Sequence, residues 1–196
     1  SDTSYNTEEK SFYGYTLKEI PTNKNGTYTE EPITVNYIYT KNDGDITGNE
    51  VTKTGPDAVN SINSEFNYTL TYKGKVENYV GKATLTLTDE LPYEATIISK
   101  DNRCDFNNNV ITCTEEYSIN GTLEINEEFN ISVKYTNINA DKIVNKVNSK
   151  LTLENNTAED ETEKETEVYK GTVVATYKDE NGNKLHINVT TTELAG

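Results

Sequence analysis

The chain has 196 residues, with 33 acidic and 18 basic side chains, so its net charge of −15 disfavours binding to nucleic acid or to anionic membranes. It contains no apolar run approaching the roughly 20 residues of a membrane span, so no membrane insertion is expected, and no signal-peptide pattern. Fourteen tyrosines and many Thr, Val and Ile residues predict an all-β fold. Because Met is absent, we expect a segment of a longer chain.

Residues 1–45 hold few strand signals, the clearest being the alternation at 33–40. Tyrosines are frequent here, and two interpretations stay open: they fill the thin core of a small sheet, or they stack against sugars. The six are Tyr5, Tyr13, Tyr15, Tyr28, Tyr37 and Tyr39. Residues 41–50 are rich in Asp, Asn and Gly and indicate a hinge; they carry oxygen ligands for calcium but lack the spacing of a known calcium loop.

Residues 46–154 show strand patterns at short, regular spacing. This cadence predicts an Ig-like β-sandwich between about residues 46 and 154. The expected strands lie at 66–72, 83–88, 94–98, 109–113, 129–135 and 143–153.

Three polar residues occupy positions of this sandwich where an apolar side chain is expected. Lys53 is in phase with Val51, Asp89 follows Leu85 and Leu87 at the same period, and Asn145 lies between Ile143 and Val147. Every second side chain of a strand points to the same face, so all three should point inward. Burying an isolated charge is costly. If the three meet, Lys53 can attack the Asn145 carboxamide, release ammonia and leave a covalent amide between two strands.

That reaction requires a neutral amine and a protonated acid, and burial shifts both pKa values in the required direction. Asp89 would shuttle the proton, inside an apolar wall for which Phe66, Tyr68 and Phe129 are candidates. Asn148 falls on the opposite face from Asn145, which makes Asn145 the expected partner. Two alternatives stay open: a buried Lys–Asp ion pair capped by the asparagine, and an exposed Lys53 at a strand start.

Cys104 and Cys113 flank an Asn-rich turn between two strand-like runs, so a disulfide across a hairpin is expected. Two free thiols are the alternative. A zinc site is disfavoured because two cysteines and the distant His186 leave one ligand short. A disulfide together with an acidic, polar surface favours an extracellular setting.

Residues 154–167 form an acidic run without large apolar side chains, and we interpret the segment 155–169 as a solvated linker, with an exposed strand edge as the alternative. Calcium binding there is the alternative to a run that binds nothing specific, and we predict no metal and no cofactor. In residues 170–196, Asn181-Gly182 between two strand-like runs is a strong hairpin signal. Each end of the chain thus resembles half a domain.

Taken in the order tail then head, the two ends resemble one MucBP repeat, a small β-rich, β-grasp-like unit. The segment 173–183 (VVATYKDENGN) resembles the opening of such a repeat, and 12–21, 26–30 and 34–41 resemble its second half. The resemblance therefore divides the chain into 1–45, the C-terminal half of a repeat; 46–154, the sandwich; 155–169, the linker; and 170–196, the N-terminal half.

The middle resembles the DUF11 sandwich of bacterial surface proteins and its relatives, the collagen-adhesin domains of Gram-positive bacteria. The resemblance rests on the segments 53–56, 66–69, 88–92, 110–113 and 143–147. In those relatives a lysine on an early strand joins an asparagine on the last strand, aided by an acid. The resemblance implies the same roles for Lys53, Asn145 and Asp89.

These observations predict a stalk or fibre repeat of an adhesin, extracellular and anchored to the cell wall of a Gram-positive bacterium. Its partners would be neighbouring repeats of the same protein, and its two ends would complete each other by strand complementation, either within one molecule or head to tail between neighbours. The alternative is a module that binds host glycans, mucin or a matrix protein. We expect no enzyme beyond a single-turnover autocatalytic cross-link, because no nucleophile motif or phosphate loop occurs.

Overall fold

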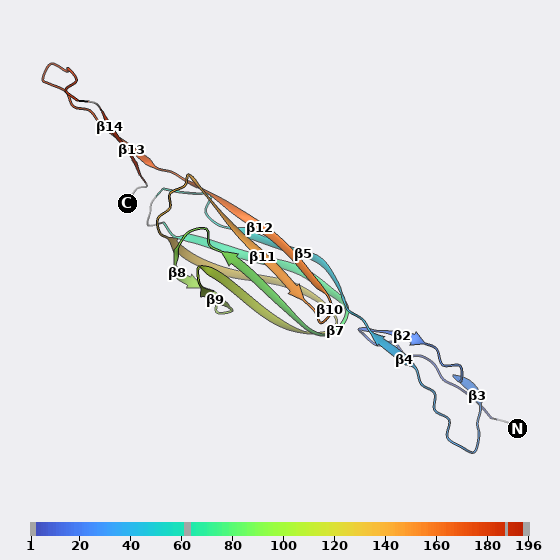
Figure 1. Ribbon diagram of the computed structural model, residues 1–196. Coiled ribbons are helices and arrows are strands. Elements are labelled where there is room, and N and C mark those ends of the chain that lie inside the picture. The colour runs from blue at the N-terminus through green and yellow to red at the C-terminus, as the bar shows by residue number, and fades with distance from the viewer. Residues whose placement is uncertain (1–2, 61–63, 187, 194–196) are drawn as a thin grey trace.

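The computed structural model describes residues 3–60, 64–186 and 188–193, and its regular structure is all β, as predicted (Figure 1). Among these residues no helix is long and apolar enough to cross a membrane. The strands are β1 (Ser4–Asn6), β2 (Tyr15–Glu19), β3 (Asn25–Thr27), β4 (Ile38–Lys41), β5 (Asp45–Thr54), β6 (Ala58–Val59), β7 (Phe66–Glu90), β8 (Ala95–Lys100), β9 (Cys104–Asn107), β10 (Val110–Tyr135), β11 (Lys142–Thr152), β12 (Thr157–Val168), β13 (Gly171–Ala175) and β14 (Val189–Glu193).

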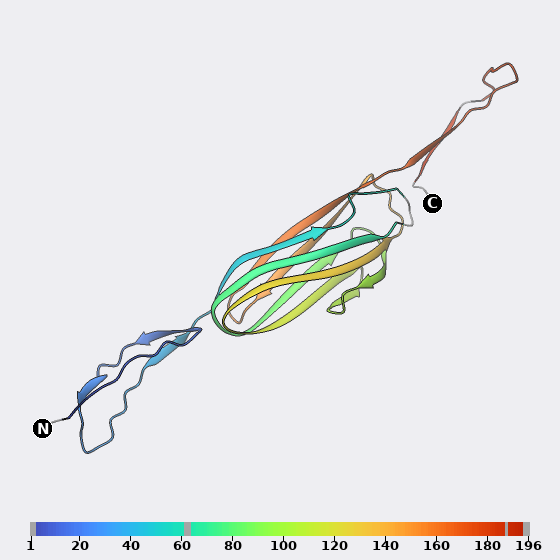
Figure 2. The same cartoon turned by 180° about the vertical axis from the view of Figure 1, so that it is seen from behind.

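The molecule is elongated, with the sandwich in the middle and a small β segment at either end (Figures 1 and 2). The N-terminal segment carries the two-stranded sheets β1–β3 and β2–β4, and the C-terminal segment is the hairpin β13–β14. The N-terminal and C-terminal segments lie at opposite ends of the sandwich in both views.

A long antiparallel ribbon of β7 and β10 builds both layers of the sandwich. The first half of β7 pairs with β5 and with the second half of β10, which also pairs with β8. The second half of β7 pairs with β11 and with the first half of β10, which also pairs with β9. The ribbon turns the corner between the layers where its register shifts at Gly121, which lies against Tyr13 of the N-terminal segment.

This ribbon is longer than the sequence predicted, because separate strands were expected on either side of the corner. In β7 the buried positions are even-numbered up to Val76 and odd-numbered from Tyr79 onward. The switch occurs at Asn78, whose φ of 54° places one extra residue in the strand. The bulge keeps the same face of the ribbon turned toward the core on both sides of the corner.

Strand β12 shows that the acidic run is a strand, as in the alternative interpretation, and corrects the predicted linker at 155–169 and the sandwich boundary at 154. Its outward positions are five glutamates at every second residue from 159 to 167, and they lie opposite β11. Lysines of β11 form ion pairs with them, at 3.0 Å for Lys150–Glu159 and 2.9 Å for Lys142–Glu165. The acidic run is therefore a strand stabilised by cross-strand charge pairs, and the sandwich extends to Val168.

The predicted hinge at 41–50 is also wrong, because β5 begins at Asp45 and the residues before it are fixed to the turn after β11. Asn155 donates to Asp43 at 3.0 Å, Asn156 donates to the Gly44 carbonyl at 2.8 Å, and Lys41 pairs with Glu154. The head segment therefore joins the sandwich through a fixed connection. The strand expected at 33–40 is shorter, since β4 begins only at Ile38.

Candidate functional site

Lys53 lies on the inward face of β5, as its phase with Val51 predicted. The residue is 6% exposed, and its side chain has no solvent-accessible surface. An exposed lysine at a strand start is thereby ruled out. A buried ammonium must be compensated by its surroundings, so the groups around Nζ decide its state.

Asp89 and Asn145 lie on neighbouring strands of the opposite layer. Asp89 is near the end of β7, and its paired residue on β11 is Val147, two positions from Asn145 on the same face. Both residues are fully buried. The structure thus brings all three predicted polar residues into the space between the layers, while Asn148 is exposed, as expected from its opposite phase.

Lys53 Nζ contacts Asp89 Oδ2 in a fully buried ion pair and lies 4.4 Å from the centre of the Tyr68 ring. Asn145 Nδ2 donates a hydrogen bond to the Tyr135 hydroxyl at 3.3 Å. The Tyr135 and Tyr68 hydroxyls are 3.2 Å apart and share a hydrogen bond. One connected network therefore holds the amine, the acid and the amide.

Two oxygens of this network lack a hydrogen-bond partner among the described residues: Asp89 Oδ1 and Asn145 Oδ1. Buried polar atoms are nearly always paired, so two orphans in one site need an explanation. A protonated Asp89 would have an O–H group that can donate a hydrogen bond. The neighbouring Asn145 Oδ1 is an acceptor that has no donor among the described residues. The site is thus incomplete as an ion pair and would be better satisfied with a proton on the carboxyl.

Burial shifts the pKa values in the direction that this protonation requires. It lowers the pKa of Lys53 from 10.5 to about 8 and raises the pKa of Asp89, even though the mutual attraction of the two charges opposes both shifts. Burial also raises the pKa of Tyr68 to about 12 and that of Tyr135 further, so both phenols stay protonated. A neutral amine beside a neutral acid is therefore accessible in this pocket.

The aromatic wall is partly as predicted. Phe66 and Tyr68 are buried with ring centres 6.1 Å apart, and Phe66 packs edge-on against Tyr135 at 4.7 Å. Phe129 is also buried, but its ring lies 4.2 Å from the Arg103 guanidinium. Tyr135 was missed, although it continues the inward alternation of Ile131 and Val133 at the end of the expected strand 129–135.

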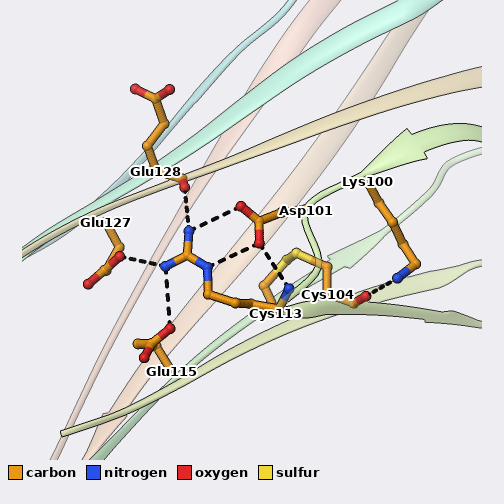
Figure 3. Close-up of a disulfide and its surroundings, with 8 residues drawn as sticks. Lys100, Asp101, Cys104, Cys113, Glu115, Glu127 and Glu128 are labelled. Carbon is orange, nitrogen blue, oxygen red and sulfur yellow. Dashed lines mark hydrogen bonds and ion pairs between the residues drawn. A yellow bond between two sulfur atoms is a disulfide. The ribbon is translucent and has the colours of Figure 1, made fainter.

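The predicted disulfide is present, and Cys104 and Cys113 are paired across the β9–β10 hairpin with an S–S distance of 2.01 Å. Neither sulfur is therefore a thiolate ligand for zinc. Beside it, Arg103 pairs with Asp101 at 3.0 Å and with Glu127 at 2.7 Å, and donates to the Glu128 carbonyl (Figure 3). This cluster fixes the turn before β9 to β10.

Within residues 3–60, 64–186 and 188–193, no three His, Cys, Asp or Glu side chains gather as metal ligands would. The tyrosines of the N-terminal segment do not form a closed core. Tyr13, Tyr15 and Tyr28 are exposed, and Tyr5, Tyr37 and Tyr39 are half-buried.

Comparison with known proteins gives one family match and a set of structural relatives. The MucBP domain family matches residues 1–40 and 172–196, about one third of the chain. No curated protein matches the sequence significantly. The DUF11-type resemblance of residues 46–154 therefore stays a prediction from the sequence.

Two solved pilins share the fold at low sequence identity. BcpA, the major pilin subunit of Bacillus cereus, is 12% identical with a TM-score of 0.51, over 84% of this chain and 67% of that chain. The full-length major pilin SpaD from Corynebacterium diphtheriae is 16% identical with a TM-score of 0.52, over 91% of this chain and 50% of SpaD. The chain thus spans half the length of SpaD.

Proposed function

We propose that the chain is a structural repeat of a stalk or fibre on the surface of a Gram-positive bacterium, stiffened by an isopeptide bond between Lys53 and Asn145. The observation that carries the proposal is the meeting of Lys53, Asp89 and Asn145 in a dry pocket between the two layers. The fold shared with two major pilins and the MucBP match at both ends support an extracellular, cell-wall-anchored adhesin.

The bond would form in a balanced sequence of steps. Asp89 takes a proton from the Lys53 ammonium, which leaves a neutral amine and a neutral acid. Nζ attacks Cγ of Asn145, and the Cγ–Nδ2 bond breaks as Nδ2 takes a proton from the attacking nitrogen and leaves as ammonia. Asp89 keeps its proton and can donate a hydrogen bond to the new amide oxygen. The reaction occurs once per chain, so it is maturation and not enzymatic turnover.

A permanent buried ion pair is the competing interpretation of the same contacts. Against it stand the two unpartnered oxygens and the burial that lowers the pKa of Lys53 to about 8. Buried ion pairs are often no more stabilising than apolar residues of similar size. Amide formation removes both charges and gives the acid and the amide oxygen a common hydrogen bond.

The position of the bond suits a load-bearing role. The N-terminal segment continues directly into β5, which carries Lys53, and β12 continues directly into the C-terminal segment. Asn145 is on β11, which pairs with β12 along its full length. Tension applied to the two ends would therefore pass from β5 through the bond into β11 and β12.

The partners we propose are neighbouring copies of the chain, joined head to tail through their terminal segments. A second candidate function is the binding of host glycans, mucin or a matrix protein, and one observation favours it. A surface depression of the N-terminal segment is lined by Tyr5 and Tyr28, and Tyr28 is exposed. A glycan array probed with the whole chain distinguishes this function from a stalk that binds no sugar.

Intact mass spectrometry of the purified chain, after reduction of the disulfide, tests the cross-link. The proposal expects a loss of about 17 Da, one ammonia per chain. The loss should disappear in Lys53→Ala, Asp89→Ala and Asn145→Ala, and it should persist in Asn148→Ala, which changes an exposed asparagine of the same strand. A full-length mass without this loss would refute the bond.

A further inference from the structure

The two terminal segments lack cores of their own. In residues 3–45 only Gly14 is buried, and between 171 and 192 none of the residues whose exposure is described is buried. Both segments consist of two-stranded sheets. Such sheets are marginal in water unless a second layer covers their apolar face. Each segment therefore needs a partner surface.

One face of the C-terminal hairpin β13–β14 carries Val173, Ala175 and Val189 together with Thr191, and the other carries Val174 and three threonines. Ala175 pairs with Val189, and Val173 lies on their side of the sheet. Val173 is 70% exposed and Val189 52% exposed. The opposite face carries paired Thr172 and Thr192, whose hydroxyls are 3.1 Å apart. Nothing in the described residues covers the face that carries Val173 and Val189.

The N-terminal segment offers a surface of matching character. On β2–β4, Leu17 pairs with Tyr39, and Tyr15 lies on the same side. Phe12 packs edge-on against Tyr39 with ring centres 5.0 Å apart. These rings border a cleft of about 530 Å³ that the sandwich corner closes on one side through Val80. Phe12 is 52% exposed and Tyr15 41% exposed.

The two surfaces cannot cover each other within one copy, because they lie at opposite ends of the sandwich (Figures 1 and 2). A single domain family nevertheless matches both segments. Charge also favours a contact between them. Residues 170–193 contain three lysines and three acidic residues, so this segment is neutral in a chain of net charge −15. It can approach an acidic copy without strong repulsion.

We propose that the β13–β14 hairpin of one copy lays its Val173 and Val189 face over the Phe12, Tyr15 and Tyr39 cleft of a second copy. These two surfaces would form the head-to-tail joint of the fibre, so the proposal rests on the proposed fibre function. It is heterologous, since each copy uses a different end, so it leaves a free cleft and a free hairpin and can propagate into a filament. The apolar faces stack, and the resulting unit has two layers around a closed core.

Complementation between two blocked variants of the full chain tests this joint. The head-blocked variant carries Phe12→Glu and Tyr15→Glu, and the tail-blocked variant carries Val173→Glu and Val189→Glu. Sedimentation velocity is run up to about 1 mM, because copies linked in one fibre meet at millimolar effective concentration. The wild type should form chains that lengthen with concentration. Each blocked variant alone should be a monomer, and their equimolar mixture should form a dimer.

Matched controls place glutamate on the opposite faces: Thr40→Glu on β4 and Thr190→Glu on β14. Both should assemble as the wild type does. A monomeric wild type at 1 mM, or a mixture that stays monomeric, overturns the proposal. A wild type that stays monomeric but binds a glycan through Tyr15 assigns the cleft to sugar instead. The ammonia loss of each variant is read in parallel, so failure of the joint is distinguishable from failure of the cross-link.

Discussion

Replacing Lys53 with Met should make the sandwich extensible under force. In the cross-linked protein, tension enters β5, passes through the Lys53–Asn145 bond and leaves through β11 and β12. Residues 54–144 are then bypassed, because they form a loop closed by a covalent bond. In Lys53→Met this loop lies in the path of the force. Met keeps the length and apolar stem of the lysine but has no amine.

The magnitude follows from the length of the loop. An extended chain spans at most about 3.3–3.6 Å per residue, so releasing the 54–144 segment adds about 300 Å of contour length. The disulfide between Cys104 and Cys113 withholds roughly a tenth of this length unless it is reduced.

Pulling the chain by its ends in an optical trap or with an atomic-force microscope measures this length directly. Any unfolding of the wild type should give a contour-length increment that excludes residues 54–144. The increment of Lys53→Met should include them. Asn148→Ala serves as the control and should behave as the wild type. Equal increments in wild type and Lys53→Met would refute the load path.

Three further predictions concern the same site and the hairpin beside it. Tyr135→Phe should slow ammonia loss about tenfold, because one hydrogen bond of about 1.4 kcal/mol to the Asn145 amide is lost; pulse expression followed by intact mass measures the rate. In Asn145→Ala, Lys53 keeps a free amine with its lowered pKa of about 8, against 10.5 in the unfolded chain. Between these pH values the unfolded state binds a proton at Lys53 that the folded state does not, so the free energy of unfolding should rise with pH by up to about 3 kcal/mol. Urea unfolding should show this rise in the variant and not in the cross-linked wild type. The double change Cys104→Ser, Cys113→Ser should lower the free energy of unfolding by about 2–3 kcal/mol, as expected for a loop of about ten residues, while the ammonia loss stays unchanged.

The sequence was sufficient to locate the candidate site because the relevant signal is local. A strand alternates strictly, so a polar residue in phase with apolar neighbours is predicted to point inward wherever the strand lies. Lys53, Asp89 and Asn145 each follow this rule. What alternation cannot give is the pairing of strands, so the meeting of the three rested on the family resemblance.

The features that were missed depend on contacts between distant parts of the chain. Strand β12 has too little apolar content to indicate a strand by itself, and it forms because β11 presents lysines opposite its glutamates. The continuity of β7 depends on one residue, Asn78, adopting a positive φ at the corner of the sandwich. Tyr135 has an ordinary inward position, and only the folded structure places its hydroxyl on Asn145.

The role of Asp89 can be separated from its shape by the isosteric change Asp89→Asn. The amide of the variant can still donate a hydrogen bond to the Asn145 oxygen, so the pocket should remain packed. It cannot accept the Lys53 proton, and the amine loses its counter-charge in a fully buried site. We therefore expect a folded protein that loses no ammonia. The pKa of Lys53 should be lowered further, because the attraction of the Asp89 carboxylate no longer opposes the desolvation of the ammonium.

Intact mass and thermal unfolding of Asp89→Asn, with Lys53→Met as the reference for a protein that lacks the bond, measure both effects. Similar unfolding temperatures of the two variants, both well below that of the wild type, would show that the carboxyl acts through the bond. Ammonia loss at the wild-type rate in Asp89→Asn would contradict the proton shuttle. Loss of the fold in Asp89→Asn with a stable Lys53→Met would instead assign Asp89 to the buried ion pair, because the uncompensated ammonium would then be the destabilising group.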